Sequence, residues 1–483
     1  MAYALNARCS RIISVYVNFP GNIGTVSPLH TTPHCTADLT TTRDGTQDRT
    51  DFVGSLPEDL HFDDYQKAFQ SKSRWELARS IAIIKMCTNN RLVDNSLMLM
   101  NTGRKVLGNR LFDRLAKPTV YGQFVGGDSP ESLLRTVVKM REMGVGPLVA
   151  VAMEEDTTDD NKEADLKYDR NLSTTLQCLE VVSGLKDPHP MMQTKLTAMF
   201  PAKLCETLSQ HVPFPSKTGH VVTLIANAIQ TGDQVKFDFL SEDETEELNK
   251  GLLRIRNLCE AAVANGVIVM VDAEYTYLNP ALNLLTLAMM LVCNQQKTLV
   301  FYTYQNYLKG MTEYLKKDMD FIHSYGVGFG TKLVRGAYID KERRLAQTQG
   351  YPDPTNATYR DTSDTYHNSM NTMLEGISKN PGKCSAIIAS HNEETVAKAV
   401  KRIVELKINP RCGSLFFGQS YGMSDHVTNT LSELKMPVYK SIPYGSVEDT
   451  LAYLSRRAME NRSVLERAQR EKTLMWKALK SRR

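Results

Sequence analysis

The feature that most constrains the fold is an alternation of short apolar runs with amphipathic helical segments, which extends from about residue 117 to residue 461. Two runs, GVIVMVDAE (266–274) and CSAIIASHN (384–392), are apolar over most of their length, as in strands buried on both faces of a parallel sheet. After an opening segment at 119–125 and a helix at 131–143, we expect strands at 147–153, 192–198, 266–272, 298–304, 329–335, 384–390, 413–418 and 437–443. Eight such strand–helix units predict a (βα)8 barrel of the TIM type.

A doubly wound open sheet is the alternative for alternating strands and helices, but no G-x-G-x-x-G motif follows the first strand. Residues 214–247 interrupt the second strand–helix unit and end in the acidic run EDETEE (Glu242–Glu247). We interpret this insertion as a surface excursion with little role in the chemistry.

Three segments lie outside the predicted barrel (117–461). Residues 1–37 contain no Asp or Glu, and their two arginines lie among hydroxyl-bearing and apolar residues, which is typical of a mitochondrial transit peptide; a disordered tail is the alternative. Residues 38–116 predict a polar linker followed, from Phe62, by a helical N-terminal region. Residues 462–483 predict a basic amphipathic C-terminal helix, for which packing is favoured over contact with an anionic membrane surface.

The composition excludes several classes of protein. The net charge of +4 is too small to indicate nucleic-acid binding. The nine cysteines are scattered without a C-x-x-C pair, which indicates free thiols in a reducing compartment and no metal site. No apolar run reaches the roughly 20 residues that a membrane-spanning helix needs.

Polar side chains follow most of the predicted strands, and in a barrel the carboxyl ends of the strands meet at the mouth of the active site. The cations expected at this mouth indicate an anionic ligand, such as a carboxylate, a phosphate or a flavin. They are Lys195, Lys332, Arg335, Arg456 and Arg457. A strand-end lysine could form a Schiff base, or the cations could hold a flavin and a carboxylate substrate for hydride transfer. A structural alternative exists for each residue; for instance, Lys195 could simply pair with Asp272. The strand-end residues are Glu154, Glu155, Lys195, Asp272, Glu274, Gln305, Lys332, Arg335, His391, Asn392, Gln419 and Ser441.

The last strand–helix unit carries two adjacent arginines. Ser446 is placed to cap a helix that starts near Val447, and Tyr453, Arg456, Arg457 and Glu460 share one face of that helix. Two guanidinium groups beside a tyrosine suit a clamp for a carboxylate. A solvated charged face is the alternative interpretation.

Five motifs together resemble the proline dehydrogenase family, from about Phe62 to Trp476. Members of that family are flavoenzymes with a (βα)8 barrel that oxidise a pyrrolidine carboxylate. A non-catalytic barrel with a degenerate site is a further alternative, but nearly all of the family's site residues are present. The motifs are VDAEYTYLNPAL (271–282), KLVRGAYIDKER (332–343), ASHNEET (389–395), FGQSYGM (417–423) and AYLSRRAMEN (452–461).

The resemblance implies a role for each matching residue. Arg456, Arg457 and Lys195 would bind the substrate carboxylate, and Tyr453 would pack against its ring. Asp272, Glu460 and Glu154 would complete the substrate side, with Glu154 pairing with Arg456 as a gate. Lys332 would lie near the flavin N5. The FAD site would be lined by Gln305, Val334, Arg335, Gly336, His391 and Asn392.

Ser441 bears on the substrate. Proline-oxidising members usually have a tyrosine here that closes over C4 of the substrate, whereas serine resembles the hydroxyproline dehydrogenase branch. A hydroxymethyl group leaves room and a hydrogen-bond partner for a 4-hydroxyl group. The resemblance therefore implies FAD-dependent oxidation of trans-4-hydroxy-L-proline to 1-pyrroline-3-hydroxy-5-carboxylate, with L-proline as the alternative substrate. It also implies electron transfer to ubiquinone at the matrix side of the inner mitochondrial membrane.

Overall fold

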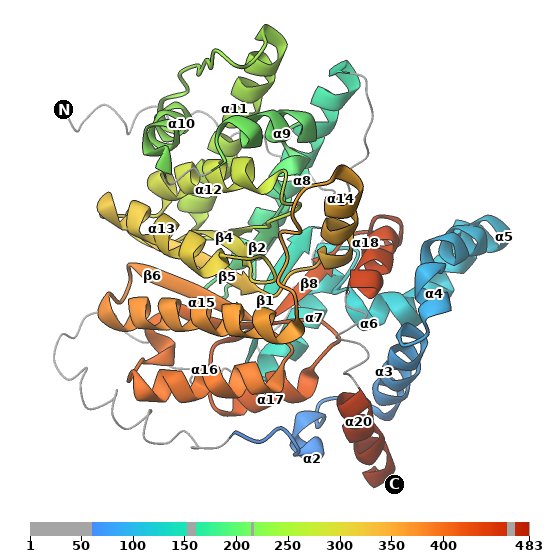
Figure 1. The fold of residues 1–483 in the computed structure, drawn as a ribbon. Helices are drawn as coiled ribbons and strands as arrows, with labels where there is room; N and C mark the ends of the chain where they lie inside the picture. The colour runs from blue at the N-terminus through green and yellow to red at the C-terminus, as the bar shows by residue number, and fades with distance from the viewer. Residues whose placement is uncertain (1–59, 152–160, 214–216, 461–468, 483) are drawn as a thin grey trace, which may run out of the picture. The chain divides into compact units, whose positions relative to one another are not determined.

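Eight parallel strands form a closed barrel in which neighbours in sequence are neighbours in space, and β8 pairs with β1. The computed structural model describes residues 60–151, 161–213, 217–460 and 469–482 (Figure 1). The predicted barrel is therefore confirmed and the open sheet is wrong. The strands are β1 (Val145–Val151), β2 (Met191–Thr194), β3 (Ile268–Val271), β4 (Val300–Gln305), β5 (Phe329–Val334), β6 (Cys384–Ala389), β7 (Leu415–Ser420) and β8 (Val438–Tyr444).

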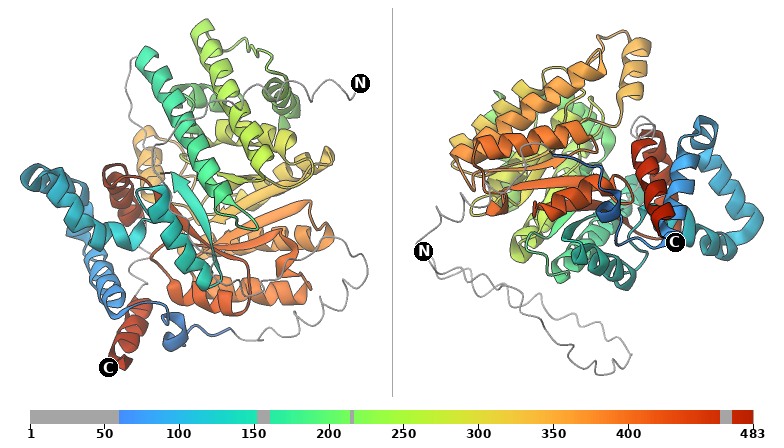
Figure 2. Two further views of the ribbon diagram at one scale, coloured as in Figure 1. Left: turned by 180° about the vertical axis from the view of Figure 1, so that it is seen from behind. Right: turned by 90° about the horizontal axis from the view of Figure 1, so that it is seen from below.

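Helices connect the strands and cover the outside of the barrel (Figures 1 and 2). Side-chain caps set where several of them begin: Ser241 and Thr358 form capping boxes, and Asn392 accepts the backbone N–H of Thr395. The helix after each strand in turn is α8 (Asn161–Gly184), α11 (Glu242–Asn265), α12 (Asn279–Cys293), α13 (Met311–Ser324), α15 (Tyr359–Lys379), α16 (Glu393–Glu405), α17 (Asp425–Glu433) and α18 (Val447–Glu460), with α14 (Ile339–Gln349) between β5 and α15.

The interior of the barrel is filled by a separate apolar cluster contributed by alternate residues of the strands. Strand β5 contributes a glycine instead, because a Cβ at Gly330 would lie 2.7 Å from the ring of Phe301. Gly146 in β1 makes room for the ring of Tyr439 in the same way. This interior cluster consists of Leu148, Met191, Ile268, Met270, Leu299, Phe301, Ile387, Phe416 and Tyr439.

The insertion at 214–247 is not a surface excursion, so that prediction is wrong for its described residues. It contains α10 (Gly219–Thr231), which follows α9 (Ala202–His211) and buries Val222, Ile225 and Ile229 in the main core. The spacing of these apolar residues is helical, and this pattern outweighs the acidic run that follows. The acidic run itself begins α11, where its carboxylates stabilise the positive end of the helix.

The segment before the barrel is helical, as predicted. It comprises α2 (Tyr65–Ala68), α3 (Arg74–Cys87), α4 (Asn90–Asp94), α5 (Ser96–Ala116), the short helical turn η2 (Lys117–Tyr121), α6 (Gly122–Phe124) and α7 (Pro130–Glu142). The opening segment at 119–125 belongs to η2 and α6, so it contributes no strand.

The C-terminal helix α20 (Gln469–Ser481) packs on α3 (Figures 1 and 2). Leu474, Met475 and Ala478 are buried against Leu77 and Ile81, so the apolar side of α20 is used inside the protein. The packing interpretation is thereby favoured. None of the helices in the described part of the chain is long and apolar enough to cross a lipid bilayer, and the predicted transit peptide lies outside the described residues.

Candidate active site

A chain of polar contacts crosses the interior of the barrel. The buried Lys332 in β5 forms an ion pair with the partly buried Asp272, which follows β3. The same ammonium donates a 2.8 Å hydrogen bond to Oε1 of Gln193 in β2. Nε2 of Gln193 donates a 2.6 Å hydrogen bond to the hydroxyl of Ser441 in β8. Residues from four strands or strand ends therefore meet in one hydrogen-bonded chain, which we call the interior chain.

The interior chain lies on the carboxyl-terminal side of the apolar cluster. Gln193, Asp272 and Ser441 each follow a member of that cluster by two residues, so they point into the barrel one layer further along. The layer of side chains at the carboxyl ends of the strands is thus polar, whereas the next layer inside the barrel is the apolar cluster. Gln193 was not a predicted site residue, although its spacing of two residues from Lys195 was a usable signal.

Lys195 belongs to a second pair. Its Nζ lies 3.6 Å from Oε2 of Glu274, and Oε1 of Glu274 accepts a 2.6 Å hydrogen bond from Thr197. The side chain of Glu274 is only 2% exposed, whereas that of Lys195 is 29% exposed. The structure pairs Lys195 with Glu274 and Asp272 with Lys332, so the alternative that Lys195 pairs with Asp272 is wrong. The side chain of Lys195 is therefore held by a buried carboxylate while part of it stays exposed.

Gln305 is held at the end of β4 by a closed set of hydrogen bonds. Its Nε2 donates to the backbone carbonyl of Glu274 at 3.1 Å, and its Oε1 accepts from Asn279 at 3.0 Å. The amide is 2% exposed. Its orientation is fixed by these partners, so any ligand at the end of β4 meets a rigid amide.

Arg335 lies at the end of β5 between two aromatic rings. Its guanidinium carbon is 4.9 Å from the ring centre of Tyr366 and 5.6 Å from that of Tyr359. One terminal nitrogen donates to Ser390 at 3.1 Å and the other to Thr395 at 2.9 Å. Its Nε is buried without a hydrogen-bond partner among the described residues. That remaining donor suits an anionic or acceptor-rich ligand.

Gly336, which follows Arg335, allows the ring of Tyr307 to lie close against the backbone. Its φ is +129°, and a Cβ on it would lie 1.5 Å from the ring of Tyr307. No other residue fits there without moving Tyr307. Val334, two residues before Gly336, ends β5, and its carbonyl accepts two hydrogen bonds from Asn306.

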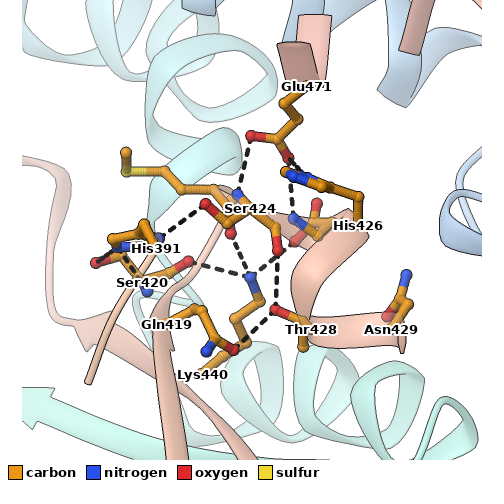
Figure 3. A network of polar contacts seen from close by, with 12 residues as sticks. His391, Gln419, Ser420, Ser424, His426, Thr428, Asn429, Lys440 and Glu471 are labelled. Atoms are coloured by element: carbon orange, nitrogen blue, oxygen red, sulfur yellow. Dashed lines mark hydrogen bonds and ion pairs between the residues drawn. The ribbon is translucent and has the colours of Figure 1, made fainter. Parts of the chain in front are cut away.

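His391 and Asn392 follow β6 and are both oriented by neighbours. His391 Nδ1 lies 2.9 Å from the hydroxyl of Ser424, and its Nε2 accepts the backbone N–H of Ser420 at 3.4 Å (Figure 3). Accepting at Nε2 leaves Nδ1 as the donor to Ser424 in the neutral ring. Asn392 caps α16 and donates to the hydroxyl of Tyr359 at 3.1 Å.

A buried charge network supports the loop that holds His391. Oε2 of Glu471, on the C-terminal helix α20, accepts the backbone N–H of Ser424 at 2.9 Å, and Oε1 accepts that of Asp425 at 2.9 Å (Figure 3). Asp425 also forms ion pairs with Lys72 at 2.6 Å and Lys440 at 2.9 Å. Lys440 is 4% exposed. The network therefore joins the N-terminal region, β8 and α20 beneath the loop after β7.

The charged groups in this network shift the pKa values of one another. Burial raises the pKa of Asp425, but the ammonium groups of Lys440 and Lys72 outweigh it and hold that pKa well below its ordinary value. Burial lowers the pKa of Lys440, whereas at Lys72 the carboxylate of Asp425 outweighs burial and the pKa is raised. At Lys440 the repulsion from the neighbouring ammonium of Lys72 acts in the same direction as burial and lowers the pKa further. We infer one carboxylate charge shared by two cations.

Several predicted site residues are described only in part. Arg456, Arg457 and Glu460 lie on the last turns of α18, and the structure describes their backbone alone. Tyr453, one turn earlier, packs against an apolar cluster formed with α5 and α6. Glu154 lies outside the described residues. The carboxylate clamp and its gate therefore stay predictions.

A family model described as "Proline dehydrogenase" matches residues 133–470 of this chain. The chain is 43% identical over 414 residues to the hydroxyproline dehydrogenase of Xenopus laevis, covering 86% of this chain and 88% of the relative. It is 39% identical over 417 residues to that of Homo sapiens, covering 84% and 90%. It is 30% identical over 533 residues to human "Proline dehydrogenase 1, mitochondrial", covering 86% and 88%.

A solved structure shares the fold. Proline utilization A from Bdellovibrio bacteriovorus, inactivated by N-propargylglycine, superposes with a TM-score of 0.59 at 19% identity. The match covers 86% of this chain but only 42% of that longer protein. At this identity the likeness concerns the barrel alone.

Proposed function

This chain belongs to the proline dehydrogenase family, and from that premise we propose that it oxidises trans-4-hydroxy-L-proline to 1-pyrroline-3-hydroxy-5-carboxylate. The observation that carries the choice of substrate is Ser441, a small hydroxyl-bearing residue that faces the interior of the barrel and is hydrogen-bonded there. The greater identity to hydroxyproline dehydrogenases than to proline dehydrogenase 1 supports the same choice. L-Proline is the second candidate, since the general reaction is the same for both amino acids.

The substrate site is formed, in this proposal, by the interior chain and the last helix. The carboxylate would be bound by Lys195 together with Arg456 and Arg457, because guanidinium groups match the geometry of a carboxylate. The partly exposed side chain of Lys195, which is held in place by Glu274, supports this role. Holding the carboxylate at one end orients the pyrrolidine ring, and Ser441 then meets the ring from β8.

The cofactor is proposed to be FAD. The unpartnered buried Nε of Arg335, the space left by Gly336 and the second amide N–H of Asn392 would fit the phosphates and ribityl chain of a dinucleotide, with His391 oriented beside them. Gln305 would meet the pyrimidine edge of the flavin with a rigid amide. When bound, FAD supplies the hydride acceptor for the carbon next to the ring nitrogen.

The protein contributes orientation and electrostatics to the reaction. Lys332 is buried, so its positive charge acts in a medium that screens it less than water does. Asp272 and Gln193 hold that ammonium in one place. A fixed cation at this point favours the negative charge that builds up on the acceptor during the reaction.

The electron acceptor is proposed to be a membrane quinone, reached on the matrix side of the inner mitochondrial membrane. Helix α5 supports this better than the C-terminal helix, whose apolar side is already buried. The large apolar side chains of α5 are exposed, and they are interspersed with the exposed cations Lys105, Arg110 and Arg114. The exposed apolar residues of α5 are Leu97, Met98, Leu99, Val106, Leu107, Leu111 and Leu115.

The decisive experiment is a turnover assay that compares trans-4-hydroxyproline with proline, using the full-length protein and an artificial electron acceptor. We expect a yellow protein with a flavin spectrum and a larger kcat/KM for hydroxyproline. A larger kcat/KM for proline would select the second candidate. A colourless protein that is trapped on its substrate by borohydride would overturn the proposal in favour of Schiff-base chemistry.

A further inference from the structure

We propose that Gln193 is a specificity-determining residue, which positions the Ser441 hydroxyl as a hydrogen-bond donor to the 4-hydroxyl group of the substrate. The inference rests on the proposed function, since it takes a 4-hydroxylated pyrrolidine carboxylate as the substrate beside Ser441. It adds a residue outside the five quoted motifs and a direction of hydrogen bonding that the comparisons do not give.

Gln193 lies between a charged donor, the ammonium of Lys332, and a neutral hydroxyl group, that of Ser441. One end of its amide meets the Lys332 ammonium at 2.8 Å, and the other meets the Ser441 hydroxyl at 2.6 Å. Lys332 is buried and is paired with Asp272, so it is held in place as one partner of the amide. The amide therefore bridges β5 and β8 from its place on β2.

The charge on Lys332 decides which way the amide is turned. An ammonium group has three N–H donors and no acceptor, so only the carbonyl oxygen of the amide can bond to it. The amide NH2 must then face Ser441, as the structure has it. An amide turned the other way would place two donors against each other beside a buried charge, which is costly.

The direction of the first bond sets the role of the serine. Because the Ser441 oxygen accepts from Gln193, its one O–H proton is free for a different acceptor. Within the described chain, the bond from Gln193 is the only hydrogen bond of this hydroxyl. The oxygen of a 4-hydroxyl group on the substrate would supply the missing acceptor. Proline has only C–H groups at C4 and would leave the donor unpaired.

The expected contribution to specificity follows from the cost of that unpaired donor. Leaving a buried donor without a partner lowers the affinity for the deficient ligand by about tenfold to a hundredfold. The effect is measured as the specificity ratio, which is kcat/KM for hydroxyproline divided by kcat/KM for proline. A merely structural role for Gln193 would change both constants by the same factor.

The test uses Gln193→Glu, which keeps the size of the side chain but removes its donor. A carboxylate can only accept, so Ser441 would have to donate to it and would lose its proton for the substrate. We expect the specificity ratio to fall at least tenfold. In a Ser441→Ala background the same change should leave the ratio within twofold, because the residue through which Gln193 acts is gone.

Two further measurements keep the test decisive. Gln193→Met, which has a similar length but no polar group, should lower the ratio only a few fold, because the serine is then free to rotate. Binding of both amino acids to anaerobically reduced enzyme, measured by calorimetry, should show the same order of preference without turnover. An unchanged ratio in Gln193→Glu, or an equal fall in the Ser441→Ala background, would overturn the inference.

The failure of this inference is distinguishable from failure of the proposed function. If the wild-type enzyme prefers proline, the proposed substrate is wrong. If it prefers hydroxyproline but Gln193→Glu keeps that preference, only the role of Gln193 is wrong.

Discussion

Lys440 and Asp425 form a 2.9 Å ion pair in the protein interior, where each of these residues is less than a tenth exposed. The pair joins strand β8 to the first turn of α17. Lys440 precedes Ser441 and points to the other side of the strand, so β8 is polar on the side that faces the barrel interior and charged on its outer side. The same strand is thus fixed from both faces.

Removing the shared carboxylate is expected to destabilise the protein strongly. Asp425→Asn would leave Lys72 and Lys440 without their common counter-charge, and breaking a buried ion pair costs about 3–5 kcal/mol. The free energy of unfolding, measured by urea denaturation, checks this. Asp320→Asn, an exposed change on α13, is the matched control and should have almost no effect. Equal stability of the two variants would contradict the role given to the network.

Stability should depend on pH through His426. Burial lowers its pKa, but the carboxylates of Glu393 and Glu471 outweigh burial and raise it to about 9. A pKa raised above its ordinary value of 6.5 stabilises the fold fully below about pH 6.5, and this contribution is lost as the pH rises through about 9.

His426→Gln tests this dependence on pH. At pH 6.5 the variant should be less stable than the wild type by roughly 3 kcal/mol, because the fold holds the histidine charged with a pKa of about 9 instead of the ordinary 6.5. By pH 9.5 most of that difference should have gone. Urea denaturation at pH 6.5 and at pH 9.5 measures the difference in stability between the wild type and the variant. An equal difference at the two pH values would exclude a stabilising charge on His426.

Ser441→Tyr should move the preference from hydroxyproline towards proline. A phenol ring fills the space that a 4-hydroxyl group needs and also breaks the bond from Gln193. The ratio of the two kcat/KM values should shift by at least tenfold, since both a steric clash and a lost hydrogen bond act against hydroxyproline. Ser385→Thr, a change in β6 that adds only a methyl group, serves as the control for altering a barrel strand. Indifference of the ratio to tyrosine would remove Ser441 as the reason for the substrate.

Arg456→Met should raise the apparent KM by about tenfold to a hundredfold, because a charge-assisted hydrogen bond to the substrate carboxylate is lost. The flavin content should stay at the wild-type level, since this residue is assigned to the substrate and not to the cofactor. Steady-state kinetics and the flavin absorbance give the two readings. Arg360→Met, on an exposed arginine of α15, is the control. A normal KM in Arg456→Met would discard the clamp.

Membrane contact should depend on α5. Replacing Leu107, Leu111 and Leu115 by serine removes apolar side chains that are 41–53% exposed, so flotation with vesicles rich in anionic lipid should drop severalfold. The matched control is Leu166→Ser on α8, where an equally apolar side chain is 62% exposed. Equal flotation of the two variants would separate α5 from the membrane.

The barrel was predictable because its evidence is local. Strand β3 is apolar throughout and β6 contains one serine, and each is followed by a helix with apolar residues at helical spacing, so eight units could be recognised one at a time. The insertion at 214–247 was misjudged for the same reason. Its acidic end is a local signal, but the burial of Val222 and Ile225 depends on helices far away in the chain.

The amino-acid sequence by itself determined which residue types stand at the strand ends, because alternation along a strand and the order of the motifs are properties of the chain alone. Only the tertiary structure decided which of these residues touch. Lys195 pairs with Glu274 and not with Asp272. Gln193 is hydrogen-bonded to both Lys332 and Ser441, although these lie 139 and 248 residues away from it in the sequence. The physical reason is that a closed barrel brings distant strands into one interior, where the pairing of each charge depends on distances that no spacing in the sequence records.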